Sequence, residues 1–217
     1  MSKQPETELC FYARIGNPAG LEQAVSQEVQ SQFTYNIPDS EDGKKRGRIR
    51  VRSTAINGDT KYEECLKVPQ ESGFVIEGCV EYPIPITKDY FDAWIAAYGV
   101  KGVDKIRYVF LSKEVILQTD GVDVTLPEVK YEVDVFLDEQ GNRSIWCKID
   151  IEIDGIMAYL SEHHPEITRF DTTVKLSSLP INPEDAFSAV TEDEEQKAAI
   201  KSFWDKFSHY PKKVEAM

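Results

Sequence analysis

Long apolar runs, closely spaced cysteines and glycine-rich nucleotide signatures are all missing from this sequence. No stretch approaches the roughly 20 apolar residues that span a bilayer, and the start, MSKQPETELC, lacks the apolar core of a secretory signal. No CxxC spacing occurs among the cysteines, which argues against zinc and fits a reducing compartment (Cys10, Cys65, Cys79 and Cys147). We therefore expect a cytoplasmic protein without membrane contact. With no Rossmann or P-loop signature, the sequence indicates no particular nucleotide.

Basic residues are also in the minority. The 217 residues include 38 Asp and Glu against 25 Lys and Arg, a formal net charge of -13 at pH 7. Such a charge repels polyanions, so we expect no non-specific binding to nucleic acid. The hydrophobic content of 41% is enough for a core, and the length favours one domain over residues 1–217. An anionic ligand would have to be attracted by a local cluster of cations.

One such cluster lies in the stretch KKRGRIRVR, residues 44–52. Arginine occupies every second position, which in a β-strand would place the guanidinium groups on one face (Arg46, Arg48, Arg50 and Arg52). Ile49 and Val51 would lie on the opposite face. Since antiparallel sheets commonly have one solvated side, this pattern alone is also that of a surface strand.

Alternation of charged and apolar residues recurs along the chain. It predicts strands over residues 7–15, 46–52, 60–68, 74–86, 104–111, 130–136 and 145–153, and either a hairpin or a loose pair of strands over 114–126. Asn57, Gly58 and Asp59 predict the turn of a hairpin. Pro83 and Pro85 are expected to end the regular pairing of their strand.

Two helices are predicted among these strands. Residues 17–33 begin with Asn17 as the cap and Pro18 at the first helical position, and they carry one apolar stripe (Leu21, Val25 and Val29). A second helix follows a cap at Thr87 and ends at Gly99.

The C-terminal part is predicted to be helical. One helix begins around Gly155 and ends near the surface pair His163 and His164. A later helix is capped by Thr191, with Glu194 completing a capping box. Its apolar stripe is expected to pack against the outside of the sheet or to contact a protein partner (Ile200, Phe203, Trp204 and Phe207).

If the charged faces of the strands converge, they form a site for metal and polyphosphate. The cations that would bind phosphate oxygens are Arg48, Arg50, Lys67, Lys105 and Arg107, with Lys130 and Lys148 as further candidates. The carboxylates that would ligate Mg2+ or Mn2+ are Glu81, Glu132, Asp134, Asp150 and Glu152. An open sheet covered by helices and a barrel with charged residues inside both fit the pattern.

The order of these motifs resembles the CYTH family of triphosphate tunnel metalloenzymes. The resemblance extends from about residue 7 to about 154. GRIRVR is similar to the family's RxR strand, YEECLKV is similar to the strand with the tunnel lysine, and KIRYVF is similar to the KxR strand. Further along, YEVDVF is similar to the ExDxF segment and KIDIEI is similar to the closing acidic pair. The resemblance implies an α+β fold: an eight-stranded antiparallel β-tunnel with an ionic interior and helices packed outside. The core strands would occupy about 7–154, and a C-terminal helical extension about 155–217.

The resemblance also implies a function. Family members include triphosphatases that act on inorganic, thiamine or RNA 5'-triphosphates, and one class of adenylate cyclase. Carried onto this sequence, it implies a ligand that is a triphosphate-bearing small molecule or an RNA 5'-triphosphate. It also implies Glu81, Glu132 and Glu152 as catalytic residues. The implied ligands for Mg2+ or Mn2+ are Glu8, Glu81, Asp150 and Glu152.

Departures from the family pattern leave two functions open. The family's first strand reads ExExK, but here Glu8 is followed by Cys10 and Tyr12. Cys79 likewise stands where a glutamate is expected, two residues before Glu81. A thiol is a poor ligand for Mg2+. The protein is therefore either a metal-dependent triphosphatase or a catalytically degenerate binding module or scaffold, which holds a phosphorylated ligand or a macromolecular partner without turnover.

Overall fold

The computed structural model consists mainly of antiparallel β-strands with a few helices, which confirms the predicted α+β class. It describes residues 4–44, 46–69, 78–112, 115–119, 122–126, 129–152, 162–164, 173–175, 181–189 and 191–211. The strands of the large sheet are β1 (Gln4–Ile15), β2 (Ser26–Asn36), β3 (Arg48–Ile56), β4 (Asp59–Pro69), β5 (Gly78–Pro85), β6 (Gly102–Ser112), β9 (Val129–Leu137), β10 (Arg143–Glu152) and β12 (Ile181–Ser188). A small sheet contains β7 (Val115–Thr119), β8 (Val122–Leu126) and β11 (Thr173–Lys175). The helices are η1 (Pro18–Gln23), α1 (Lys88–Tyr98) and α3 (Glu194–Phe207), and no helix in the described ranges is long and apolar enough to cross a membrane.

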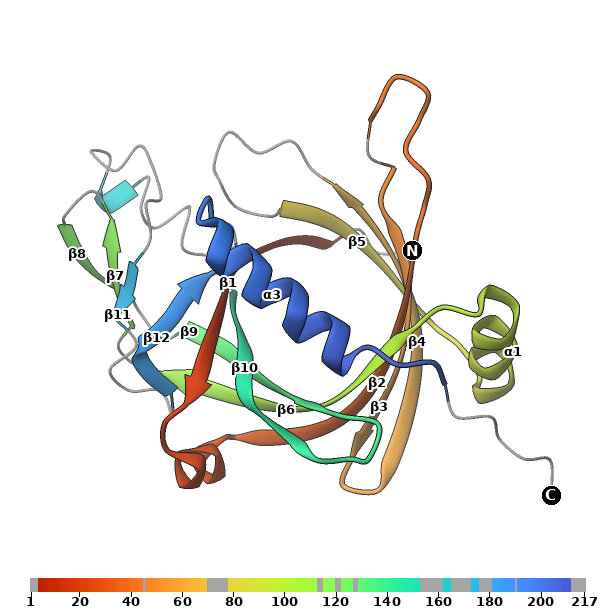
Figure 1. Ribbon diagram of the computed structural model, residues 1–217, viewed down its shortest axis with the longest axis horizontal. Helices are drawn as coiled ribbons and strands as arrows, with labels where there is room; N and C mark the ends of the chain where they lie inside the picture. The colour runs from red at the N-terminus through yellow and green to blue at the C-terminus, as the bar shows by residue number, and fades with distance from the viewer. Residues whose placement is uncertain are drawn as a thin grey trace.

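The large sheet curls round on itself into a tunnel-like barrel (Figure 1). Its strands follow the order β10, β9, β6, β2, β3, β4, β5, β1 and β12, and β10 pairs with β1 as well. The β1–β10 pairing places Glu8 opposite Glu152 and Arg14 opposite Trp146. The first residues of β1 pair instead with β5. Because β1 is joined to both β5 and β10, these strands form a ring.

Apolar side chains on the outward face of the strands form the main core. Leu9, Phe11 and Ala13 on β1 belong to the same buried cluster as Ile149 and Ile151 on β10. Residues from η1 and β12 complete this cluster (Leu21 and Ile181). Since successive side chains of a strand point to opposite faces, this packing turns the charged residues of β1 and β10 toward the other face.

Helix α1 packs on the outer face of β2, β3 and β4. The apolar contacts that hold it form a second buried cluster (Phe33, Val51, Phe91, Trp94 and Ile95). The hydroxyl oxygen of Thr87 accepts a hydrogen bond of 3.2 Å from the backbone N–H of Tyr90. Gly99 ends the helix in a left-handed conformation with φ of 58°. Both ends of this helix therefore match the prediction.

The predicted helix over residues 17–33 is wrong. Its first part is the short helix η1, and its second part is strand β2, which pairs with β3 on one edge and with β6 on the other. Val25 and Val29, assigned to a buried stripe, are 62% and 48% exposed. Hydrogen bonding along two neighbouring strands outweighs the helical spacing of these residues. The structure also continues β5 through Pro83 and Pro85, both of which are paired with β4.

The C-terminal region also differs from the prediction. It is not helical throughout, because β12 pairs with β1 and β11 pairs with β7. Helix α3 is capped by Asp193, whose carboxylate accepts from the backbone N–H groups of Glu195 and Gln196 at 2.8 and 3.1 Å, so the proposed capping box of Thr191 and Glu194 is wrong. The predicted helix from Gly155 lies mostly outside the described residues.

Candidate anion-binding cavity

A cavity of about 1280 Å3 extends into the barrel and is bounded by its strands and by helix α3. Its described lining includes nine cationic side chains, namely Arg48, Arg50, Arg52, Lys67, Lys101, Lys105, Arg107, Lys130 and Lys148. It also includes seven carboxylates, namely Glu8, Asp39, Glu81, Glu132, Asp134, Asp150 and Glu152. A chain with a net charge of -13 thus carries an excess of positive charge around this cavity, which favours an anionic ligand.

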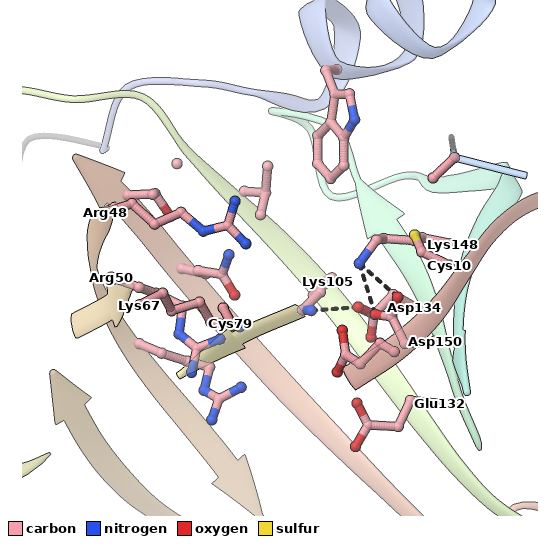
Figure 2. A pocket seen from close by; sticks show the side chains of 18 of the residues that line it. Cys10, Arg48, Arg50, Lys67, Cys79, Lys105, Glu132, Asp134, Lys148 and Asp150 are labelled. Atoms are coloured by element: carbon pink, nitrogen blue, oxygen red, sulfur yellow. Dashed lines mark hydrogen bonds and ion pairs between the residues drawn. The ribbon is translucent and has the colours of Figure 1, made fainter. Parts of the chain in front are cut away.

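Every residue predicted for the site lines this cavity, although the residues come from strands far apart in the sequence. The structure brings these side chains together, and the roles assigned to them stay predictions. They lie in two groups (Figure 2). We call Arg48, Arg50, Arg52 and Lys67, with Glu63 and Glu81, the arginine wall. We call Lys105, Arg107, Lys130 and Lys148, with Glu132, Asp134, Asp150 and Glu152, the mixed wall.

The arginine wall is formed by β3, β4 and β5. Arg50 Nη2 lies 3.3 Å from Glu63 Oε1 and 3.6 Å from Glu81 Oε1. Arg52 Nη2 lies 3.2 Å from the same oxygen of Glu63, and Lys67 forms an ion pair with Glu81. Arg50, Arg52 and Lys67 therefore share two carboxylates, so these three cations are not fully neutralised by Glu63 and Glu81.

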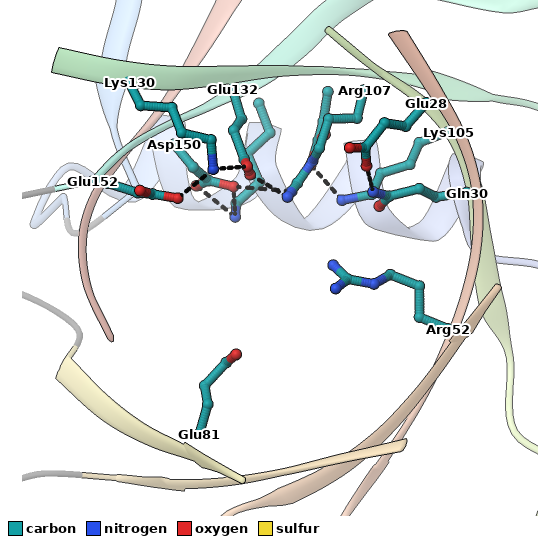
Figure 3. Close-up of polar contacts among 12 residues, drawn as sticks. Glu28, Gln30, Arg52, Glu81, Lys105, Arg107, Lys130, Glu132, Asp150 and Glu152 are labelled. Atoms are coloured by element: carbon teal, nitrogen blue, oxygen red, sulfur yellow. Dashed lines mark hydrogen bonds and ion pairs between the residues drawn. The ribbon is translucent and has the colours of Figure 1, made fainter. Parts of the chain in front are cut away.

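Two hydrogen-bond donors of this wall lack an acceptor. Arg50 Nε and Arg52 Nε are buried, and neither has a hydrogen-bond partner within the part of the chain that the structure describes. Burial lowers the pKa of the Arg52 guanidinium, and the positive charge of Arg50 lowers it further. Both effects disfavour the charged form, so an anion placed between the walls would stabilise it. Figure 3 shows Arg52 and Glu81 extending from their strands into the interior, across from the mixed wall.

Asp134 is the centre of the mixed wall. It lies opposite Arg107 on β6 and opposite Lys148 on β10, so three adjacent strands place unlike charges side by side. Arg107 Nε and Nη2 donate to Asp134 at 2.7 and 2.9 Å, and Lys105 donates to it as well. Burial alone would raise the pKa of Asp134, but Lys105 and Arg107 hold it well below the usual range. Burial lowers the pKa of Lys105 to about 8, although Asp134 opposes this shift.

The other carboxylates of the mixed wall are bound by lysines. Lys148 Nζ lies 2.7 Å from Asp150 Oδ1 and 2.8 Å from its Oδ2. Lys130 Nζ lies 3.0 Å from Glu132 Oε1 and 2.6 Å from Glu152 Oε1. These lysines project from β10 and β9, the strands that carry the carboxylates themselves.

The carboxylates as arranged do not fit a divalent metal. Within the described residues, no three His, Cys, Asp or Glu side chains are placed to hold an ion. Glu81 is paired with Lys67 on the arginine wall, apart from Asp150 and Glu152. Glu8 does lie opposite Glu152 on the β1–β10 pair, as the predicted metal set requires. The oxygen donors are therefore suitable in chemical type but do not form a preformed site.

Strand β1 contributes Cys10 and Tyr12 to the cavity instead of a carboxylate and a cation. Cys10 lies opposite Asp150, and burial raises the pKa of its thiol. A protonated thiol is a weak ligand for a hard cation. Tyr12 Oη accepts a hydrogen bond of 2.8 Å from Trp204 Nε1 on α3, which ties this helix to the barrel.

Helix α3 lies across one mouth of the barrel (Figure 1), and Ile200 and Trp204 line the cavity. Its apolar stripe packs on Phe136 of β9, whose ring centroid lies 5.1 Å from those of Phe203 and Trp204. The stripe thus packs at a mouth of the barrel, whereas the sequence predicted that it would pack on the outside of the sheet. A protein partner for this helix remains a prediction.

Several lining residues were not among the predicted site residues. Asp134 and Lys148, named only as candidates, line the cavity, and Arg52 was left out although it shares the two-residue spacing of Arg48 and Arg50. The neutral polar face of β2 was missed because its segment was predicted to be helical (Gln32, Thr34 and Asn36). The alternation of Phe33 and Tyr35 with these polar residues was the signal for a strand.

Comparisons with known proteins give only distant likenesses. No family model matches the chain, and no curated protein matches it. The solved structures that resemble it include the PH1819 protein from Pyrococcus horikoshii OT3, with a TM-score of 0.47 and 14% identity over 90% of this chain and 99% of that one. A conserved hypothetical protein from Pyrococcus furiosus has a TM-score of 0.44 and 16% identity over 83% and 94%.

A third solved structure is a putative adenylyl cyclase from Hippeastrum with a dominant triphosphatase activity. Its TM-score is 0.39, with 15% identity over 72% of this chain and 87% of that one. All three TM-scores lie below 0.5, so the function of this chain has to be inferred from its own side chains. The resemblance to the CYTH family rests on the order of its motifs along the strands.

Proposed function

We propose that the cavity binds a triphosphate-bearing small molecule, with the phosphate oxygens held by the arginine wall. The observation that carries this proposal is the set of cations on this wall: Arg48, Arg50, Arg52 and Lys67 line the cavity, and the ion pairs of the last three are with two carboxylates, Glu63 and Glu81. Phosphate oxygens accept such donors through charge-assisted hydrogen bonds, and a planar guanidinium can offer two of them at once.

The distribution of charge indicates where the phosphates lie. In the mixed wall, each cation already contacts at least one carboxylate of that wall. In the arginine wall, within the described residues, Arg50, Arg52 and Lys67 form ion pairs with Glu63 and Glu81, so three cations share two carboxylates. Uncompensated buried charge is unfavourable, so an anion should bind more strongly at the arginine wall than at the mixed wall. An RNA 5'-triphosphate presents the same phosphates, but the rest of such a polyanion is repelled by the net charge of -13.

Binding without turnover fits the geometry better than hydrolysis. Metal-dependent hydrolysis would need carboxylate oxygens free to ligate Mg2+ or Mn2+, whereas Glu81, Glu132, Asp150 and Glu152 are all engaged by cations. We therefore assign no catalytic step to these residues.

A triphosphatase is the second candidate. It is supported by the closeness of four carboxylates on neighbouring strands, since Glu8 lies opposite Glu152 and Asp150 lies opposite Glu132. This candidate requires that ligand binding draws the cations away from these carboxylates.

A ligand screen distinguishes the two candidates. Purified protein is titrated in a calorimeter with tripolyphosphate, nucleoside triphosphates, thiamine triphosphate and a short 5'-triphosphorylated RNA, and phosphate release is followed with Mg2+ and with Mn2+. We expect binding of at least one triphosphate compound without release of phosphate. Sustained phosphate release would establish the triphosphatase instead, and no binding of any compound would refute the proposed function.

A further inference from the structure

The ammonium group of Lys148 lies among the carboxylates of the mixed wall. It contacts both carboxylate oxygens of Asp150, at 2.7 and 2.8 Å. On β9 the residue directly opposite Lys148 is Asp134, and the residue opposite Asp150 is Glu132. The side chains of Asp134 and Asp150 are almost fully buried. Lys148 therefore joins Arg107 where carboxylates from two strands meet, and it is the cation that contacts both oxygens of Asp150.

Lys130 supplies a second charge of this kind. It bridges Glu132 on its own strand and Glu152 on β10, at 3.0 and 2.6 Å. Lys130 and Lys148 together contact Glu132, Asp150 and Glu152 (Figure 3 labels Lys130 and these three carboxylates). These are the carboxylates that a divalent cation would need on this wall.

A tethered ammonium group competes strongly with a dissolved ion. Because the lysines project from the same strands as the carboxylates, they are present at a high effective concentration and cannot diffuse away. Mg2+ or Mn2+ would have to displace them and then satisfy six or so oxygen ligands. The thiol of Cys10, directly opposite Asp150, does not supply one of those oxygens.

We infer that Lys148 and Lys130 are built-in counter-ions of the mixed wall, and that the cavity holds its phosphate ligand without a divalent metal. This inference rests on the proposed function for its ligand, but its central claim concerns the lysines alone. The phosphates would bind the arginine wall, and the lysines would keep the opposite carboxylates neutralised, so that they do not repel the ligand.

The first measurement compares tripolyphosphate binding in the presence of a chelator with binding in Mn2+, with the free tripolyphosphate concentration corrected for its complex with the metal. We expect the same dissociation constant under both conditions, within about twofold. Binding that occurs only with Mn2+, or that is tightened by roughly tenfold or more, would overturn the inference. Absence of binding under both conditions would refute the proposed function and leave the second measurement to decide the role of the lysines.

The second measurement follows Mn2+ directly by electron paramagnetic resonance, without phosphate. Wild-type protein and Lys148→Arg, which keeps the charge, are expected to bind no Mn2+. Lys148→Gln is expected to gain Mn2+ affinity by roughly ten- to hundred-fold, since Asp150 then loses the cation that contacts both of its oxygens and keeps only the more distant Arg107, at 3.8 Å, among the described residues. Lys88→Gln is the matched control, because Lys88 also pairs with an aspartate, Asp92, but on the exposed surface of α1.

Two results would contradict the role of the lysines. One is Mn2+ binding by the wild-type protein, and the other is no gain of affinity in a folded Lys148→Gln protein. Circular dichroism establishes whether the variant folds. If it does not, Lys130→Gln gives the same test, because Lys130 is more exposed and its loss strains the fold less.

Discussion

The Asp134→Asn variant is expected to have a free energy of unfolding about 3 to 5 kcal/mol lower than the wild type, measured by denaturant titration. Only 1% of the Asp134 side chain is exposed, and it binds both Lys105 and Arg107. Removing its charge leaves two buried cations without their main carboxylate, and an unpaired buried charge is far costlier than a broken surface pair. Asp134 also raises the pKa of Lys105, so its loss should allow this lysine to lose its proton.

The matched control is Asp92→Asn on α1, which breaks an exposed pair with Lys88. We expect that change to alter stability by less than about 1 kcal/mol. The pH dependence gives a second check. The folded pKa of Asp134 lies below its unfolded value, so its contribution to stability is complete above about pH 4 and is lost as the pH falls toward the folded pKa. Asp134→Asn should therefore show a shallower loss of stability in acid. Equal, small effects of both variants would contradict the role of Asp134.

The strands were predictable where one face is apolar and the other is charged. In β3 and β10 the alternation is strict, and a shift of one residue would turn Ile149 and Ile151 away from the core. Helix α1 was predictable because its ends carry local signals, Thr87 and Gly99, that do not depend on the rest of the fold.

Strand β2 could not be assigned by the same reasoning. Its inward face has one charged residue, Glu28, among neutral polar ones, so it lacks the charged alternation that marks the other strands, and Val25 and Val29 fall at helical spacing. The alternation of Phe33 and Tyr35 with polar residues covers only the end of the segment, and the pairing with β3 and β6 that makes the rest a strand is invisible in local spacing.

The residues around the cavity were predictable as a set, but their partners were not. Alternation places Arg50, Lys105 and Asp150 on charged faces without showing which carboxylate each cation contacts. Those contacts depend on strand register: Lys148 is matched with Asp134 only because β9 and β10 pair as they do. The position of α3 across a mouth of the barrel had no signal in the sequence either, since an apolar stripe does not indicate what covers it.

Replacing Arg50 with alanine is expected to weaken tripolyphosphate binding by roughly ten- to hundred-fold, as measured by calorimetry. Arg50 is buried in the middle of β3, lines the cavity and has an Nε without an acceptor in the described chain. Charge-assisted hydrogen bonds lost from such a position cost about 1.5 to 3 kcal/mol each. The fold should survive the change, because Glu63 is still bound by Arg52 and Glu81 by Lys67.

Arg46→Ala is the matched control from the same run of arginines. Arg46 is exposed and precedes β3. It is not among the described residues that line the cavity. Its guanidinium group is separated from the ligand by solvent, which screens its charge over about 8 Å at physiological ionic strength. We expect binding within about twofold of the wild type for this variant. Equal losses in the two variants would indicate a general effect of net charge, and no loss in either would show that the arginine wall does not hold the phosphates.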